Sequence, residues 1–149
     1  MGDFIPLFTR ASKLMRGAAD AGMSRHGVRV GQNLVIDALT ADDGLTPGEL
    51  AQRLHVTTPT IVKMATRMEA AGLLTRRRDE RDARLVRLYL TDRGRSLHEL
   101  IEEELKRLQE RATAGLTREE RRRLESALTK IIRNLEPIAP AADEARDVD

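Results

Sequence analysis

Two helix-start signals that lie close together in the middle of the chain constrain its fold more than any other feature. The first is Thr46-Pro47-Gly48-Glu49, where a threonine N-cap, a proline in the first turn and a glutamate three residues after the cap form a capping box. It predicts a helix over 47–54. The second is the hydroxyl-rich stretch 57–60, which predicts a helix over about 58–71 that ends at Gly72. Two short helices joined by a few residues form a helix-turn-helix.

The period of the apolar residues changes after Gly72. Val86, Leu88 and Leu90 alternate with Arg87 and Tyr89, which is the two-residue period of a strand. An arginine-rich segment and a polar run precede them, so we expect a β-hairpin with a charged tip directly after the second helix. A helix-turn-helix followed by such a wing predicts a winged helix-turn-helix lobe over 30–95.

Apolar stripes at helical spacing flank this lobe. They predict a first helix over Pro6–Ala21, with the break marked by Gly22 and Gly27, and a second helix with Val30, Leu34, Val35, Ala38 and Leu39 on its apolar face. A long helix is expected after Thr91, with Leu97, Leu100, Ile101, Leu105 and Leu108 on one stripe, and another after the capping box Thr117-Arg118-Glu119-Glu120. The apolar faces of the first helix and of the two long helices would be left uncovered on a monomer this small. The helices over 4–22 and 96–138 are therefore expected to hold a homodimer together. The expected fold class is mainly α with a small β-hairpin wing, in one domain over 1–149, with a short acidic, disordered tail over 141–149.

The composition of the chain excludes several classes of protein. The chain has 149 residues, 40% hydrophobic, 34% charged and 2% aromatic, which suits one globular helical domain with an aliphatic core. The absence of cysteine excludes disulfides, cysteine metal sites and thiol redox switches. No apolar run reaches membrane-spanning length and no signal pattern opens the chain, so we expect a cytoplasmic protein, associated with the nucleoid when bound to DNA.

The charge is unevenly distributed along the chain. The segment 53–95 holds eleven basic and five acidic residues, a formal charge of +6, although the whole chain carries only +2. This asymmetry is typical of a nucleic-acid binder. The alternative is that it reflects the arginine bias of a GC-rich genome, since only four of the 26 basic residues are lysine.

The second helix of the motif would enter the major groove of B-DNA with its first two turns toward the base edges. Lys63 and Arg67 would then supply affinity, and either one alone could equally be part of a solvated face. In the wing, Arg84 is the candidate for the minor groove, with Asp82 to orient it; the plain alternative is a surface ion pair. Arg76, Arg77 and Arg78 are phosphate contacts or counter-charges for Asp79 and Glu80. The predicted DNA-binding residues are Thr57, Thr58, Pro59, Thr60, Lys63, Arg67, Arg76, Arg78, Asp82 and Arg84.

Four segments in order resemble the MarR family of bacterial transcriptional regulators: Leu45–Ala51, Met68–Leu74, Asp82-Ala83-Arg84 and Leu90–Gly94. The resemblance runs from about Gln32 to Leu97, and its most specific part is the Asp-x-Arg wing followed by Leu-Thr-x-x-Gly. It implies a homodimer on a pseudo-palindromic operator, with repression as the expected mode and release by a small phenolic or anionic ligand between the dimerisation helices and the DNA lobe.

Candidates for that ligand are Arg10, Arg16 and His26, each of which could also be simply solvated. No cofactor or metal site is expected, because His98 and Glu102, one helical turn apart, are only two ligands. There is no phosphate-binding loop, nucleophile elbow or histidine triad, so we do not expect an enzyme. The alternative function is a winged-helix module that binds a protein and has no operator of its own.

Overall fold

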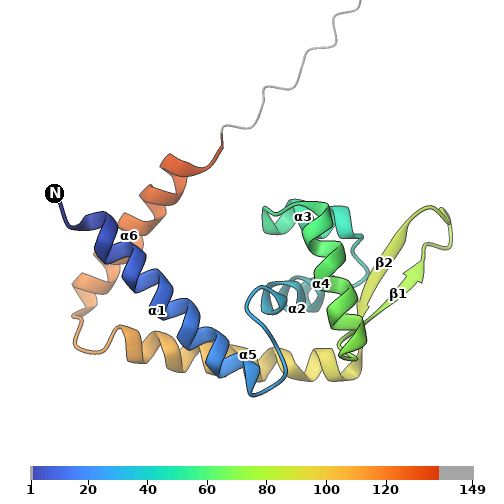
Figure 1. The fold of residues 1–149 in the computed structure, drawn as a ribbon, viewed down its shortest axis with the longest axis horizontal. Helices are drawn as coiled ribbons and strands as arrows, with labels where there is room; N and C mark the ends of the chain where they lie inside the picture. Colours follow the sequence, from blue (N-terminus) through green and yellow to red (C-terminus); the bar gives the residue numbers. More distant parts are fainter. Residues whose placement is uncertain (1, 138–149) are drawn as a thin grey trace, which may run out of the picture. The chain divides into compact units, whose positions relative to one another are not determined.

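The computed structural model describes residues 2–137, in two compact units that meet between Ala112 and Thr113. The tail 141–149 and the last residue of the expected 96–138 segment lie outside the described part. The elements of the first unit are α1 (Phe4–Ser24), α2 (Gln32–Ala41), α3 (Pro47–Leu54), α4 (Thr58–Ala70), β1 (Leu74–Arg78), β2 (Val86–Leu90) and α5 (Asp92–Ala112); the second contains α6 (Arg118–Leu135) (Figure 1).

The predicted helix-turn-helix forms, and its first start signal makes the expected side-chain cap whereas the hydroxyls of the second do not. The Thr46 hydroxyl accepts a hydrogen bond from the Glu49 amide at 3.2 Å, and the Glu49 carboxylate accepts one from the Thr46 amide at 3.3 Å. These bonds satisfy first-turn amides that the helix itself leaves unpaired. α3 ends at Leu54, its C-cap residue His55 takes a left-handed conformation with φ 56°, and α4 begins at Thr58. Ile61, Ala65 and Met68 on α4 are buried, as the apolar spacing predicted.

The wing is a two-stranded antiparallel sheet in which Leu74 pairs with Leu90 and Arg78 with Val86. Leu45, just before α3, forms a further bridge to Leu88, whose amide donates to the Leu45 carbonyl at 2.9 Å. The base of the wing is therefore attached to the helix-turn-helix. These elements confirm the predicted fold class, mainly α with a β-hairpin wing.

The expected break at Gly22 was wrong, because α1 continues to Ser24. Gly22 is buried against α5, where a Cβ at this position would lie 3.0 Å from the Glu104 carboxylate. A glycine at position 22 thus allows α1 and α5 to approach closely and does not mark a turn. Glycine at position 31, with φ 99°, instead precedes α2.

The predicted stripe of the second helix was also partly wrong. Leu34, placed on the buried side, is 49% exposed, whereas Ile36 is completely buried. α2 packs against α3, β2 and α5, so its buried face is broad. The spacing of apolar residues alone therefore does not tell its buried positions from its exposed ones.

Helix α5 runs along α1 and α2 in the first unit (Figure 1). Leu97 and Ile101 on α5 are buried, and Leu100, assigned to the same stripe, is 41% exposed. In the second unit, Thr117 and Glu120 form the predicted capping box of α6, and α6 has no buried residue. None of the helices within 2–137 combines the length and apolarity that a membrane crossing requires.

We expect Gly94→Ala to destabilise the first unit by about 1–3 kcal/mol, the usual cost of overpacking a core. A Cβ on Gly94, in the first turn of α5, would overlap the carbonyl oxygen of Leu73. The measurement is chemical denaturation monitored by circular dichroism. Gly17→Ala on α1 is the matched control, because nothing lies within 4 Å of its Cβ and alanine favours a helix by up to about 1 kcal/mol. Equal stability of the Gly94 variant and the wild type would contradict the packing described here.

Candidate nucleic-acid interface

The two sides of α4 have different surroundings. Ile61, Ala65 and Met68 face the core. Lys63 is exposed on the opposite side, and Arg67 is exposed beside it. Two residues that the sequence analysis left out share this outer surface, namely Val62, 39% exposed, and Thr66. Extending the helical period from Pro59 to positions 62, 63 and 66 would have found them.

The first turn of α4 lacks a side-chain cap. Thr57 is the N-cap residue, but its hydroxyl lies 2.8 Å from the Thr60 hydroxyl and makes no bond to a helix amide. Thr58, Pro59 and Thr60 are exposed. Helix N-termini with free amides attract anions, so this end of α4 is suited to a phosphate oxygen.

The arginines of β1 have separate contacts. Arg76 donates to the Thr66 hydroxyl of α4 at 2.6 Å and lies 3.7 Å from the Glu69 carboxylate. Arg77 lies over the ring of Tyr89, 4.9 Å from its centroid. Arg78 is exposed. The alternative that these arginines neutralise Asp79 was wrong, because Asp79 is held by Arg87.

At the tip of the wing, Asp82 holds Arg84 through both carboxylate oxygens. The Arg84 guanidinium donates at 3.0 Å and 3.1 Å, and the Arg84 amide donates at 3.1 Å. These bonds from Arg84 lower the pKa of Asp82 below its usual range, so the carboxylate stays charged. The Arg84 side chain is nevertheless 90% exposed. The tip therefore presents a guanidinium that is oriented and open to solvent.

Arg87 connects the wing to the helix-turn-helix. Its Nε donates to the Asp79 carboxylate at 2.7 Å, and its Nη1 donates to the Gly44 carbonyl at 2.9 Å, in the loop before α3. Asp79 also accepts from the Arg81 amide at 2.7 Å. The pKa of Asp79 is lowered by that amide first and by Arg87 second. Sequence analysis did not assign this role, since nothing in the spacing of Gly44 and Arg87 indicates a contact.

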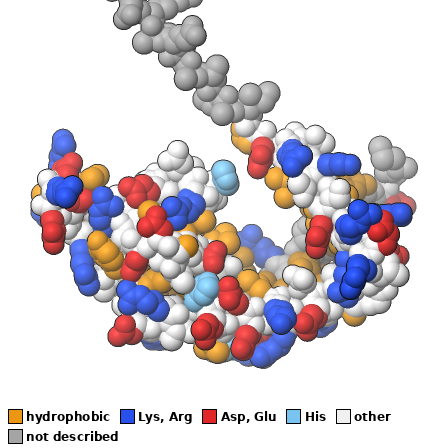
Figure 2. Space-filling view, turned by 180° about the vertical axis from the view of Figure 1, so that it is seen from behind, with side chains coloured by type: hydrophobic (Ala, Val, Ile, Leu, Met, Phe, Trp, Pro, Cys, Tyr) orange, Lys and Arg blue, Asp and Glu red, His pale blue; other side chains and the backbone are white. Residues whose placement is uncertain are grey.

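The wing surface carries charges of both signs. Figure 2 shows lysine and arginine side chains at the outer end of the wing, at the left edge of that view, with acidic side chains between them. Two of the acidic groups at the tip, Asp82 and Asp79, hold Arg84 and Arg87. Several of the five acidic residues in the basic segment thus position arginines.

A hollow of about 910 Å³ lies between α1 and α4. Arg16, one of the three ligand candidates, lines it together with Lys13, Lys63 and Arg67. Within the described residues, these four side chains have no carboxylate at ion-pair distance, while Asp20 in the same hollow lies 3.5 Å from Arg29. The hollow therefore has a positive character.

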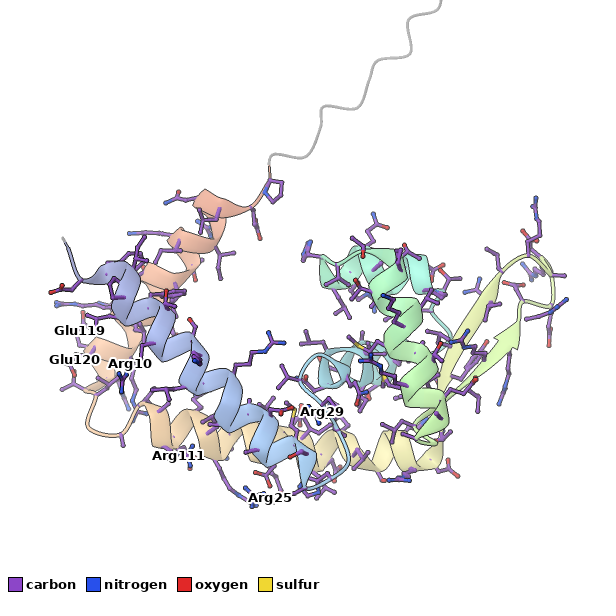
Figure 3. The ribbon with its side chains drawn as sticks, viewed as in Figure 1. Arg10, Arg25, Arg29, Arg111, Glu119 and Glu120 are labelled. Atoms are coloured by element: carbon purple, nitrogen blue, oxygen red, sulfur yellow. The ribbon has the colours of Figure 1, made fainter. Side chains whose placement is uncertain are left out.

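The structure does not bring the other two ligand candidates into this hollow. Arg10 lies toward the beginning of α1, far along the helix from Arg25 and Arg29 (Figure 3). His26 lies 3.3 Å from the Glu104 carboxylate on α5. The cleft expected to hold Arg10, Arg16 and His26 together is therefore not formed.

These faces, an exposed helix of a helix-turn-helix beside an arginine-tipped hairpin, define a winged helix-turn-helix protein. Residues 26–85 match the MarR family model. The resemblance to the MarR family that the sequence motifs indicated is therefore confirmed over these residues.

Relatives carry regulator names but are matched over part of their length. The transcriptional regulator TtmR of Methylorubrum extorquens is 36% identical over 75 residues, which are 50% of this chain and 38% of TtmR. The transcriptional repressor MdtR of Bacillus subtilis is 32% identical over 98 residues, 66% of this chain and 63% of MdtR. The chain thus spans less than two thirds of either relative.

Solved structures match more of the chain. A Staphylococcus aureus MepR–DNA complex has a TM-score of 0.80 at 27% identity, with 89% of this chain and 98% of that chain covered. A MarR mutant from Escherichia coli complexed with operator DNA has a TM-score of 0.77 at 23% identity, with 85% and 91% covered, and shows the fold alone.

Proposed function

We propose that this chain is a transcriptional regulator that binds double-stranded DNA sequence-specifically, as a homodimer on a pseudo-palindromic operator, and represses. The observation that carries the proposal is the Arg84 side chain, 90% exposed and held by Asp82 at the tip of the wing. A guanidinium held in this way loses little conformational freedom on entering a narrow minor groove. The names of the matched regulators and the MepR–DNA complex support the same reading.

The exposed side of α4 would supply the major-groove contacts. Lys63 would reach phosphates or guanine acceptors, and the methyl groups of Val62 and Thr66 would suit thymine. Thr57, Thr58, Pro59 and Thr60 allow close approach to the backbone, where the free amides of the first turn meet a phosphate. Arg76, which is hydrogen-bonded to Thr66, would hold the wing in a fixed position relative to α4. Arg78 would contact a phosphate. This role needs no catalytic residue. It places the protein in the cytoplasm, where the DNA is.

We expect Arg84→Ala to weaken operator binding by at least about 1 kcal/mol and to reduce the salt dependence by about one ion. The measurement is fluorescence anisotropy with a duplex from the gene's own upstream region, titrated at several salt concentrations. Arg81→Ala is the matched control at the same tip, because the Arg81 contact to Asp79 is made by its backbone amide. Binding no tighter than to random DNA would favour the alternative function, a module for protein partners.

The dimer rests on apolar side chains left exposed on α1 and α6. Phe4 and Phe8 form an aromatic pair on α1, with centroids 5.8 Å apart, yet are 49% and 41% exposed. On α6, Ile132 is 56% exposed and Leu135 77%. Large apolar side chains exposed on a helix are typical of a surface that contacts another protein. A second copy of the chain is the partner we propose, because the two-fold symmetry would pair two α4 helices with two operator half-sites.

We expect the wild type to sediment as a dimer at micromolar concentration and Phe8→Glu to shift it toward monomer, because a charge buried in an apolar interface is costly. Leu85→Glu is the control, a leucine of similar exposure (40%) on the wing. A wild-type monomer, or an equal effect of the two substitutions, would argue against the dimer.

The hollow between α1 and α4 is the place we propose for a small anionic or phenolic ligand. A carboxylate there would engage Arg16 and also Lys63 and Arg67 of α4. It would thereby withdraw two cations from DNA, and this competition provides the differential affinity that release requires.

We expect benzoate, used as a probe, to displace the operator duplex from the wild type, and Arg16→Gln to raise the benzoate concentration required at least about threefold, since a charge-assisted hydrogen bond is lost. Anisotropy at constant ionic strength measures this effect. Arg10→Gln, on the same helix but outside the hollow, is the matched control. Displacement unaffected by Arg16→Gln would rule out this hollow as the site.

A further inference from the structure

His98 is placed where the sequence alone shows only half of a cluster. It lies on α5, one turn before Glu102, and its Nε2 is 3.5 Å from the Glu102 carboxylate. The fold adds Asp37 of α2, whose carboxylate oxygen is 3.1 Å from the same Nε2. Asp37 is 61 residues away in the chain, so no spacing rule connects the two.

The separations of these atoms match those of ligands around one ion. Two ligand atoms each at about 2.0–2.1 Å from a tetrahedral zinc lie roughly 3.3 Å apart. The distances of 3.1 Å and 3.5 Å bracket that value, and one atom from each of the three residues lies within 4.8 Å of the others.

The cluster also has uncompensated charge. Among the described residues, neither Asp37 nor Glu102 has a lysine or arginine at ion-pair distance, so two carboxylates face one imidazole. His26 also lies beside a carboxylate, that of Glu104, but this carboxylate has basic neighbours. It lies 3.9 Å from Arg25 and 3.7 Å from Arg107. Arginines thus neutralise the carboxylate at that second site, whereas no described lysine or arginine does so for Asp37 and Glu102.

Space for the remaining ligands of an ion is present. The three side chains line a hollow of about 190 Å³ between α2 and α5, whose other lining residues include Asn33, Leu34, Ile101 and Leu105. His98 is partly buried, with 21% of its side chain exposed, while Asp37 and Glu102 are open to solvent. Water molecules can complete the coordination from the solvent side.

We propose that Asp37, His98 and Glu102 bind one divalent first-row transition metal ion, with zinc as the reference ion. Imidazole favours such ions over magnesium and calcium, which prefer oxygen ligands alone. The ion bridges α2, which belongs to the winged-helix lobe, and α5, which leads out of it. Binding therefore links these two helices, and the linkage stabilises the fold in proportion to ion concentration.

The test is a zinc titration of chelator-treated full-length protein against a chromogenic zinc chelator. We expect one zinc ion per chain, and a loss of at least about tenfold in affinity for His98→Gln and for Asp37→Asn, since even residues that only support metal ligands cost about 10–100-fold. Excess magnesium should not displace zinc. Saturating zinc should raise the midpoint of thermal unfolding of the wild type and leave that of His98→Gln nearly unchanged.

Glu99→Gln is the matched control, because it removes one exposed carboxylate of α5 next to His98 but outside the cluster. Its zinc affinity should equal that of the wild type. Circular dichroism of the metal-free variants checks their folding, and the two ligand variants test the cluster independently. Absence of stoichiometric binding, equal affinity of wild type and both ligand variants, or displacement by magnesium would each overturn the proposal. None of these measurements involves DNA, so they succeed or fail separately from the proposed regulatory function.

Discussion

The contact between the segment Gly72–Leu73 and the start of α5 is the one on which the rest of the first unit depends. The Leu73 carbonyl accepts from the Thr91 amide at 3.1 Å, and the Thr91 hydroxyl donates to the Gly72 carbonyl at 2.6 Å. Gly94 allows this backbone approach because it has no side chain to obstruct it. The end of α4, the base of the wing and the long helix are joined here, so the position of the exposed face of α4 depends on a few backbone bonds.

Acidic residues organise the arginines of the wing. Asp79 binds Arg87, which reaches the loop before α3, and Asp82 binds Arg84 at the tip. The pKa of Asp79 is lowered first by the hydrogen bond from the Arg81 amide and then by Arg87, and the pKa of Asp82 is lowered by its hydrogen bonds from Arg84. The Asp82–Arg84 pair is exposed and adds little to stability, so its value lies in orienting the Arg84 guanidinium. A basic segment that contained only arginine would be more positive but less ordered.

Sequence reasoning was most successful where the information is local. The capping boxes at Thr46 and Thr117 and the alternation over Val86–Leu90 each predicted an element whose hydrogen bonds lie within a few residues. It failed at Gly22, at Leu34 and at the partner of Asp79, because each of these depends on what another element places opposite. The DNA-binding and ligand residues remain proposals, and of the ligand candidates only Arg16 lies in the hollow beside α4.

The sequence by itself determined the helix starts, the hairpin, the separation of charge along the chain and the resemblance of the winged-helix lobe to the MarR family, because these follow from short-range periodicity and motif spacing. Only the tertiary structure decided which polar and charged groups that are distant in the chain meet. Arg87 reaches Gly44, and Asp37 meets His98, across long stretches of chain. Such contacts arise from the packing of α2, α3, β2 and α5 around a shared core, and a linear pattern holds no information about which surfaces that packing places together.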